Sequence, residues 1–163
     1  MPELTRARLG IARAVRTLLV VALSAATVAA SAIPALASFN PALNTPAGTT
    51  PAAVATGDFN GDSRLDLAVA DQGSNRVTIL FGNGSGGFSA GPSYTVGKAP
   101  GAIVAADLNG DGKLDLVVAN GGSHSVSILL GNGSGGFTYG PSVSVGSDPA
   151  ALAVADLNGD GKP

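Results

Sequence analysis

The sequence predicts an all-β fold built from repeated units, and two observations carry this prediction. Residues 52–100 align with residues 101–149 without a gap, which gives a period of 101 − 52 = 49 residues. Within each repeat, short apolar runs are bounded by Gly, Asn and Pro, a pattern that is typical of strands rather than helices. A period of about 20–50 residues indicates a solenoid, a propeller or an array.

Four strands are expected in each repeat, at roughly 52–57, 65–71, 76–81 and 88–96 of the first. In the second of these strands, Leu65, Leu67 and Val69 are expected to share one face. Many outward positions are Ala, Val or Ser, which suits strands that are covered on both faces. Four-stranded antiparallel units of this length match the blades of a β-propeller, in which neighbouring blades cover each other. We therefore predict an incomplete β-propeller of about two and a half repeats.

The chain divides at the repeat boundaries and at an N-terminal targeting segment. The basic start, the apolar run at 17–30 and Ala35-Leu36-Ala37 before Ser38 predict a secretory signal peptide that is cleaved after Ala37. The apolar run is short for a membrane span, and an uncleaved N-terminal anchor is the alternative. The expected segments are a signal peptide at 1–37, the last strand of a preceding or closing blade at 38–51, repeat 1 at 52–100, repeat 2 at 101–149 and a truncated start of repeat 3 at 150–163.

The charge limits which partners the protein can bind, and the cysteine count limits what can stabilise its fold. From Ser38 onward the chain has five basic residues and ten Asp, so its formal charge is 5 − 10 = −5. This balance argues against a nucleic-acid partner, which requires a basic face. The chain has no Cys, so a core, a bound metal or further chain must stabilise it in place of disulfides.

Eight of those ten Asp lie in three copies of one glycine-rich loop, and their spacing predicts a Ca²⁺ site. Side-chain oxygens stand at positions 1, 3, 5 and 9 of the loop, and position 7 would offer its backbone carbonyl. Such hard oxygen donors suit Ca²⁺ better than Zn²⁺ or copper, and Mg²⁺ demands a stricter octahedral geometry. The predicted ligands are Asp58, Asn60, Asp62, the Arg64 carbonyl and Asp66; Asp107, Asn109, Asp111, the Lys113 carbonyl and Asp115; and, in the incomplete third copy, Asp156, Asn158 and Asp160.

Two other interpretations of these loops fit the sequence less well. Metal-free hairpin turns need an Asn-Gly or Asp-Gly pair but not acids at positions 1, 5 and 9 as well. An EF-hand needs a bidentate Glu at position 12, where this chain has Val69 and Val118. Ser63 replaces the glycine found at position 6 of the second loop, so we expect the first site to be strained and weaker. A structural role that ties strand 1 to strand 2 is expected, with an affinity of about 10⁻⁴–10⁻³ M.

The repeats resemble FG-GAP (VCBS-type) repeats, the blades of integrin α-subunit-like β-propellers. The resemblance spans about 39–163 and is carried by the D-x-N-G-D-x-x-x-D loops at 58–66 and 107–115, by "ILFGNGSGGF" at 79–88, and by "GKAP" at 97–100. It implies an extracellular Ca²⁺-binding propeller, usually of seven blades, found in adhesion proteins and beside the catalytic domains of secreted enzymes. A propeller needs at least four blades, so we expect a fragment whose blade faces require further repeats or self-association.

No catalytic constellation is evident in the sequence, so a non-enzymatic module is expected. The leading interpretation is a secreted Ca²⁺-binding module that binds an extracellular protein or glycan ligand. The alternative is the non-catalytic propeller part of a secreted hydrolase or lyase, and a third is a cell-surface spacer. "GNGSGG" at 82–87 imitates a dinucleotide fingerprint, but no helix is expected after it, so a hairpin turn is predicted. His124 is expected in a loop, and Asp71 and Asp148 are expected to be turn or solvated residues.

Overall fold

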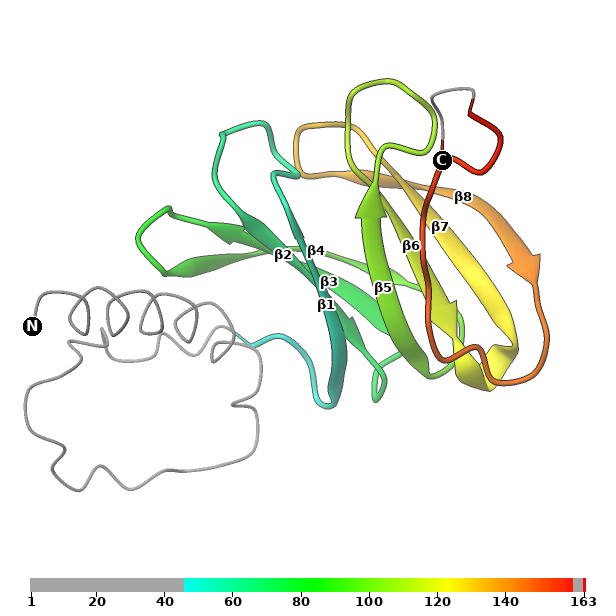
Figure 1. Cartoon of the computed structure of the whole chain (residues 1–163). Helices are drawn as coiled ribbons and strands as arrows, with labels where there is room; N and C mark the ends of the chain where they lie inside the picture. Colours follow the sequence, from blue (N-terminus) through cyan, green and yellow to red (C-terminus); the bar gives the residue numbers. More distant parts are fainter. Residues whose placement is uncertain (1–45, 160–162) are drawn as a thin grey trace, which may run out of the picture. The chain divides into compact units, whose positions relative to one another are not determined.

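The computed structural model describes residues 46–159 and 163, and this part of the chain is all-β apart from one short 3₁₀ turn (Figure 1). The predicted signal peptide at 1–37, most of the segment 38–51 and the candidate ligand Asp160 lie outside the described residues. No helix in the described part is long and apolar enough to cross a lipid bilayer.

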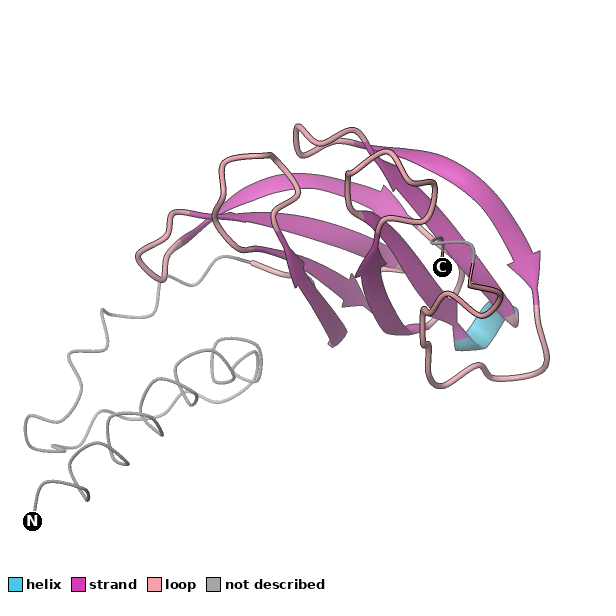
Figure 2. Cartoon of the chain, turned by 45° about the horizontal axis from the view of Figure 1, so that its top comes forward, coloured by secondary structure: helices cyan, strands magenta, loops and turns pink. Residues whose placement is uncertain are grey.

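The strands form two four-stranded antiparallel sheets, each with its strands in sequence order (Figure 2). The first sheet contains β1 (Pro51–Gly57), β2 (Asp66–Asp71), β3 (Arg76–Gly82) and β4 (Phe88–Thr95). The second sheet contains β5 (Pro100–Ala106), β6 (Asp115–Asn120), β7 (Ser125–Gly131) and β8 (Phe137–Ser144), with the 3₁₀ turn η1 (Gly121–Ser123) between β6 and β7. The predicted strands and the all-β repeat fold are therefore confirmed.

The pairing register is the same in both sheets. A register shift separates Pro51 from Ala53 in the first sheet and Pro100 from Ala102 in the second. A second shift, between β3 and β4, recurs between β7 and β8. Because such irregularities bend a strand and increase its twist, their recurrence gives both sheets the same local shape.

The main core lies between the two sheets. Alternate residues of β2 enter different clusters: Ala68 and Ala70 join the core shared with the second sheet, whereas Leu67 and Val69 join a smaller cluster. All six residues of β2 are buried, as are all six of β6. The buried members of the shared core are Ala55, Phe59, Ala68, Ala70, Val77, Ile79, Ile103, Leu116, Val118, Leu129 and Phe137. The prediction that the central strands are covered on both faces is confirmed.

The prediction that Leu65 shares one face of the strand with Leu67 and Val69 is wrong. It precedes β2 and is 64% exposed. Its counterpart in repeat 2, Leu114, packs against the shared core, where a side chain on Gly57 would collide with it. The two leucines differ because Leu114 has the first sheet beside it, a neighbour that periodicity within one strand does not reveal.

Candidate metal centre in the aspartate loops

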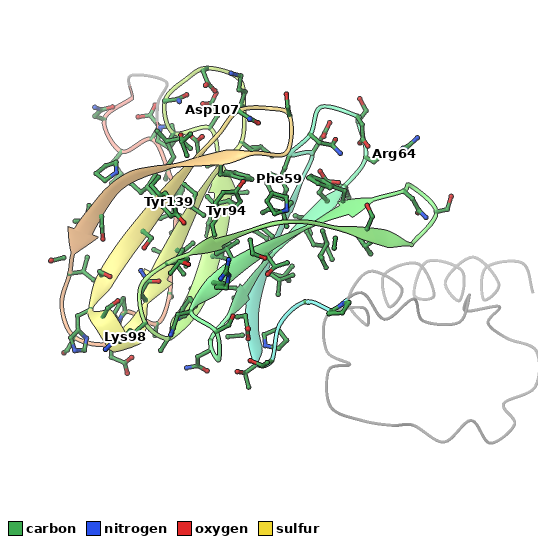
Figure 3. All side chains as sticks on the ribbon, turned by 180° about the vertical axis from the view of Figure 1, so that it is seen from behind. Phe59, Arg64, Tyr94, Lys98, Asp107 and Tyr139 are labelled. Carbon is green, nitrogen blue, oxygen red and sulfur yellow. The ribbon has the colours of Figure 1, made fainter. Side chains whose placement is uncertain are left out.

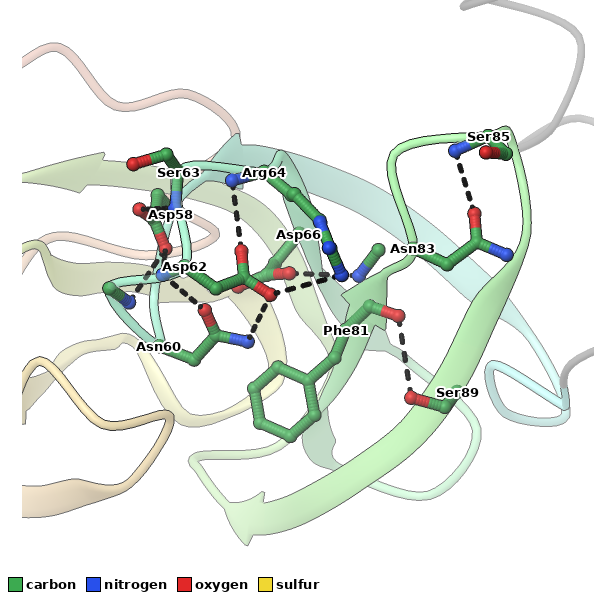
Figure 4. Close-up of polar contacts among 12 residues, drawn as sticks. Asp58, Asn60, Asp62, Ser63, Arg64, Asp66, Phe81, Asn83, Ser85 and Ser89 are labelled. Atoms are coloured by element: carbon green, nitrogen blue, oxygen red, sulfur yellow. Dashed lines mark hydrogen bonds and ion pairs between the residues drawn. The ribbon is translucent and has the colours of Figure 1, made fainter.

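The first aspartate loop, residues 58–66, is folded around the carboxylate of its first residue (Figure 4). Asp58 Oδ1 accepts the backbone N–H groups of Gly61 at 2.7 Å and Asp62 at 3.2 Å, and Asp58 Oδ2 accepts that of Ser63 at 2.7 Å. Three successive backbone donors therefore point at one carboxylate, and the chain turns tightly around it.

The second aspartate loop, residues 107–115, repeats this arrangement. Asp107 accepts the N–H groups of Gly110 at 2.8 Å, Asp111 at 3.2 Å and Gly112 at 2.8 Å. In the third copy, Asp156 accepts the N–H of Gly159 at 2.7 Å. Because the same bonds form in loops with different neighbours, the D-x-N-G-D sequence itself specifies the turn.

Position 6 of both loops has the left-handed backbone conformation. Its φ angle is 63° at Ser63 and 79° at Gly112. A left-handed conformation costs a residue with a Cβ about 1–2 kcal/mol, and glycine avoids this cost. The expected backbone strain at Ser63 is therefore present in the first loop and absent at the same position of the second.

Positions 3 and 5 continue the chain of internal bonds. Asn60 Oδ1 accepts the N–H of Asp62 at 2.9 Å, and Asp62 Oδ1 accepts the N–H of Arg64 at 2.9 Å. The Arg64 guanidinium lies 3.9 Å from Asp62 Oδ2, and the Lys113 ammonium lies 3.7 Å from Asp111 Oδ2. These ion pairs are partly exposed and contribute little to stability. Each loop thus has a single basic side chain near its acids.

The carboxylate at position 9 is buried and links its loop to the end of the third strand of the sheet. Asp66 has no exposed surface, and its Oδ2 accepts the N–H of Phe59 at 3.0 Å while its Oδ1 accepts that of Gly82 at 2.8 Å. Asp115 makes the matching bonds to Leu108 at 3.0 Å and Gly131 at 2.8 Å. From the sequence, these two aspartates are expected only as metal ligands. The sequence does contain a sign of this link between loop and strand, because Gly82 follows Asp66, and Gly131 follows Asp115, at the same spacing of 16 residues.

Hydrogen bonds lower the pKa of the first carboxylate in both loops. At Asp58, desolvation raises the pKa, but the N–H groups of Ser63, Gly61 and Asp62 outweigh it and hold the pKa below its ordinary value. At Asp107, the largest contribution is the Gly112 N–H, which lowers the pKa against a smaller opposing effect of desolvation. Both carboxylates are therefore ionised at neutral pH, as a cation ligand must be.

The donor chemistry of the loops fits a hard divalent cation. Every predicted ligand offers oxygen. Asp58 Oδ1 already accepts two N–H groups, whereas Asp58 Oδ2 accepts one and keeps further acceptor capacity, and the same holds for Asp107. Among the described residues, no three His, Cys, Asp or Glu side chains form a group that could hold a metal ion. The side chains of Asp58 and Asp62 instead bond to N–H groups of their own loop. The ligand set named from the sequence stays a prediction.

The "GNGSGG" segments and His124 lie in turns, as the sequence predicts. The "GNGSGG" segments form the hairpins between β3 and β4 and between β7 and β8, and each segment leads directly into a strand rather than a helix. His124 ends the short turn η1 with a φ of 51° and accepts the N–H of Asp148 at 3.0 Å through Nδ1.

The expectation that Asp71 is a turn or solvated residue is wrong, because Asp71 is the buried last residue of β2. It has no exposed surface, and it accepts the N–H groups of Thr49 at 3.0 Å and Thr50 at 2.6 Å together with the hydroxyl of Ser74. Asp71 is thus a buried acceptor that holds the segment before β1, a role that only the approach of Thr49 and Thr50 reveals.

Two neighbouring four-stranded sheets, each with an aspartate loop between its first and second strands, are blades of an incomplete β-propeller. The family model described as FG-GAP-like repeat matches residues 58–118 and 107–163, which together cover 163 − 58 + 1 = 106 of the 163 residues. The chain therefore belongs to the FG-GAP-like repeat family, and the resemblance seen in the sequence is confirmed. A search of curated proteins found no match to the chain.

Proposed function

We propose that this protein is a secreted, non-enzymatic Ca²⁺-binding repeat module in which the cation has a structural role. The observation that carries the proposal is the recurrence of one loop at a constant period, with the same hydrogen bonds around an ionised first aspartate. The acids at positions 1, 5 and 9 also accept backbone N–H groups of their blade. Their negative charges are compensated only in part by the one basic side chain of each loop, and a bound divalent cation would neutralise the remainder.

The position of the loops supports a structural rather than a catalytic cation. Each loop joins the first strand of a blade to the second, so a cation held there would tie the two strands together. The acids repel one another at neutral pH, and the single basic side chain in each loop compensates them only in part. A divalent cation would remove this repulsion and stabilise the corner of the blade.

The proposed compartment is the cell exterior, either as secreted protein or on the cell surface. FG-GAP-like repeats are typical of extracellular proteins, and the N-terminal 37 residues have the composition of a signal peptide. Mass spectrometry of secreted material should find Ser38 as the first residue. An intact N-terminus that begins at Met1 would contradict the signal-peptide interpretation.

Calorimetry and thermal unfolding test the cation directly. With a dissociation constant of about 1 mM, 10 mM Ca²⁺ should stabilise the folded chain by about 1.4 kcal/mol per site. We expect heat of binding and a higher melting temperature with Ca²⁺, and a smaller effect with Mg²⁺. The absence of both heat and a thermal shift at millimolar Ca²⁺ would contradict the proposal.

The proposed partner is an extracellular protein or glycan that binds the exposed loops, as in cell adhesion. The negative charge of the chain after residue 37 makes direct attraction to acidic ligands weak and leaves Ca²⁺-dependent contact as the expected mode. A glycan array and a cell-adhesion assay, each run with Ca²⁺ and with a chelator, test this part of the proposal. Binding that is insensitive to the chelator would exclude a role for the cation in recognition.

A further inference from the structure

The turn between β2 and β3 ends in Asn75, and this residue holds the chain where it leaves β4. The backbone carbonyl of Asn75 accepts the Val96 N–H at 3.0 Å. Its side-chain Oδ1 accepts the N–H of Ala99, the residue before β5, at 2.8 Å. One residue therefore holds both ends of the short connection from β4 to β5. We call these two hydrogen bonds, one to a backbone carbonyl and one to the side chain of the same residue, the junction clamp.

His124 forms a second junction clamp, one repeat later. Its backbone carbonyl accepts the Val145 N–H at 2.9 Å, and its side-chain Nδ1 accepts the Asp148 N–H at 3.0 Å. His124 follows Asn75 by 124 − 75 = 49 residues, and Asp148 follows Ala99 by 148 − 99 = 49 residues, which is the period of the repeat. The same clamp thus holds the chain where it leaves β8, with an imidazole nitrogen in the place of an amide oxygen.

The residue at the far end of each clamp has a left-handed backbone conformation. Its φ angle is 49° at Ala99 and 55° at Asp148. This conformation is unfavourable for a residue with a Cβ, because the Cβ lies too close to the following carbonyl oxygen. The side-chain bond of each clamp therefore holds a backbone conformation that the residue would otherwise leave. Loss of that bond should let the connection relax.

The two clamps differ in their response to protons. A neutral imidazole that accepts through Nδ1 carries its proton on Nε2, and protonation places a hydrogen on Nδ1, which then no longer accepts. Histidine is the side chain whose ordinary titration falls between pH 5 and pH 8, and His124 is the only histidine of the chain. The amide of Asn75 does not titrate in this range. Acidification therefore removes the acceptor of the Asp148 N–H and leaves the acceptor of the Ala99 N–H in place.

Two charged side chains, those of Asp148 and Lys98, pack beside the turn η1 that leads into the second clamp. A Cβ on Gly121 would collide with the Asp148 carboxylate, and a Cβ on Gly122 would lie 3.2 Å from the Lys98 Cβ. The neighbouring strands β5 and β7 carry no charged residue. Figure 3 shows Lys98 and Asp107 at opposite ends of the second sheet, so the clamp is remote from the aspartate loops.

We propose that His124 is a proton-sensitive clamp. Its neutral imidazole holds the segment 145–148, and acidification from pH 8 to pH 5 releases the Asp148 N–H. Because the closed clamp uses only the neutral imidazole, the side-chain bond is present above the ordinary titration range of histidine and is lost as the pH falls through that range. The Asn75 clamp stays closed throughout. This device needs no cation and is independent of the proposed function.

NMR of the ¹⁵N-labelled wild-type chain in EDTA tests the clamp directly. At pH 8 a scalar coupling across the hydrogen bond should join the Asp148 amide nitrogen to His124 Nδ1, and this coupling should vanish at pH 5. After correction for the intrinsic effect of pH, the Asp148 amide should exchange its hydrogen at least about threefold faster at pH 5 than at pH 8. The Ala99 amide should not change. A missing coupling at pH 8, or an equal response of the two amides, would overturn the inference.

Exchange of the two clamp residues provides matched variants. His124→Asn should keep the second clamp closed at pH 5, because an amide oxygen takes the place of the imidazole nitrogen, as it does at Asn75. Asn75→His should transfer the response to acid to the Ala99 amide. Both variants are measured by the same corrected hydrogen exchange. A response to acid that survives in His124→Asn, or that does not appear in Asn75→His, would overturn the inference.

Asp148→Asn separates the imidazole nitrogen from the nearby carboxylate as the cause of release. This variant keeps the Asp148 N–H donor and removes only the charge. Release at pH 5 should persist in Asp148→Asn, since it depends on the hydrogen added to Nδ1 of His124. A clamp that stays closed at pH 5 in this variant would show that the carboxylate controls the junction, and it would overturn the role of His124.

Discussion

Asp66 and Gly82 lie 16 residues apart in the chain and are joined by a hydrogen bond of 2.8 Å from the Gly82 N–H to the buried Asp66 Oδ1. The other carboxylate oxygen accepts the Phe59 N–H at 3.0 Å. A single side chain therefore joins the aspartate loop to the end of β3. This role does not require a cation, and it separates Asp66 from the exposed acids of the same loop.

Asp66→Ala should destabilise the chain even when divalent cations are removed. The substitution leaves two buried N–H groups without an acceptor, and each such group costs about 1–3 kcal/mol. Denaturant unfolding in EDTA should show a loss of about 3 kcal/mol. Asp62→Ala, at an exposed position, should lose less than about 1 kcal/mol under the same conditions. Equal losses for the two variants would show that Asp66 does not have this structural role.

Gly82→Ala should be strongly destabilising because an added Cβ would overlap the Leu65 carbonyl. Steric crowding of this kind typically costs about 1–3 kcal/mol. Gly101→Ala is the matched control, because Gly101 lies in β5 with open space where its Cβ would point. Ala at that position should be neutral or slightly stabilising. Similar unfolding midpoints for the two variants would contradict the close approach.

Ser63→Gly should stabilise the first loop, since a glycine relieves the left-handed backbone strain at φ 63°. The expected gain is about 1 kcal/mol in the free energy of unfolding. The reciprocal variant Gly112→Ser should lose a similar amount, because a Cβ at Gly112 meets no neighbouring atom and its cost is conformational only. Thermal unfolding of both variants in EDTA measures these changes. Melting temperatures that shift in the same direction would disprove backbone strain at Ser63 as the cause.

Asp71 should make stability depend on pH below about 4. Burial raises the pKa of its carboxyl, but the hydroxyl of Ser74 and the N–H groups of Thr49 and Thr50 outweigh burial and hold the pKa below its ordinary value of 3.8. A carboxylate with a lowered folded pKa contributes stability above its unfolded pKa, and this contribution is lost as pH falls through the folded pKa. The difference in unfolding free energy between the wild type and Asp71→Asn should therefore shrink as the solution is acidified from pH 6 to about pH 3. A constant difference would contradict the assignment.

Asp111→Ala should weaken Ca²⁺ binding and lower the melting temperature in the presence of Ca²⁺. The side chain supplies one of the predicted oxygen ligands of the second loop, and the remaining acids would hold the cation poorly. Its removal in EDTA should have a smaller effect, because its ion pair with Lys113 is partly exposed to solvent and the Lys113 N–H that it accepts lies in an exposed part of the loop. Calorimetry and thermal unfolding, each with and without Ca²⁺, measure both quantities. Unchanged values in Ca²⁺ would contradict the assigned role.

Much of the fold follows from short-range features of the sequence. The strand limits were predicted to within about one residue in repeat 1, because apolar alternation and flanking glycines mark strands locally. The turn around Asp58 and Asp107 was also predictable, since its hydrogen bonds join residues at most five positions apart. The role of Asp66 was not, because its acceptor bond to Gly82 spans two strands.

Equivalent residues of the repeats show where the sequence alone stops being informative. Phe59 is 2% exposed, Leu108 is half-buried and Leu157 is 95% exposed, although all three occupy position 2 of the same loop. Leu65 and Leu114 differ in the same way. The sequence by itself determined the period, the strands and the turn of each loop, because these depend on hydrogen bonds and side-chain alternation within a few residues. Only the tertiary structure decided which loop is covered, because burial depends on whether a neighbouring sheet brings its hairpin and its apolar side chains against that loop.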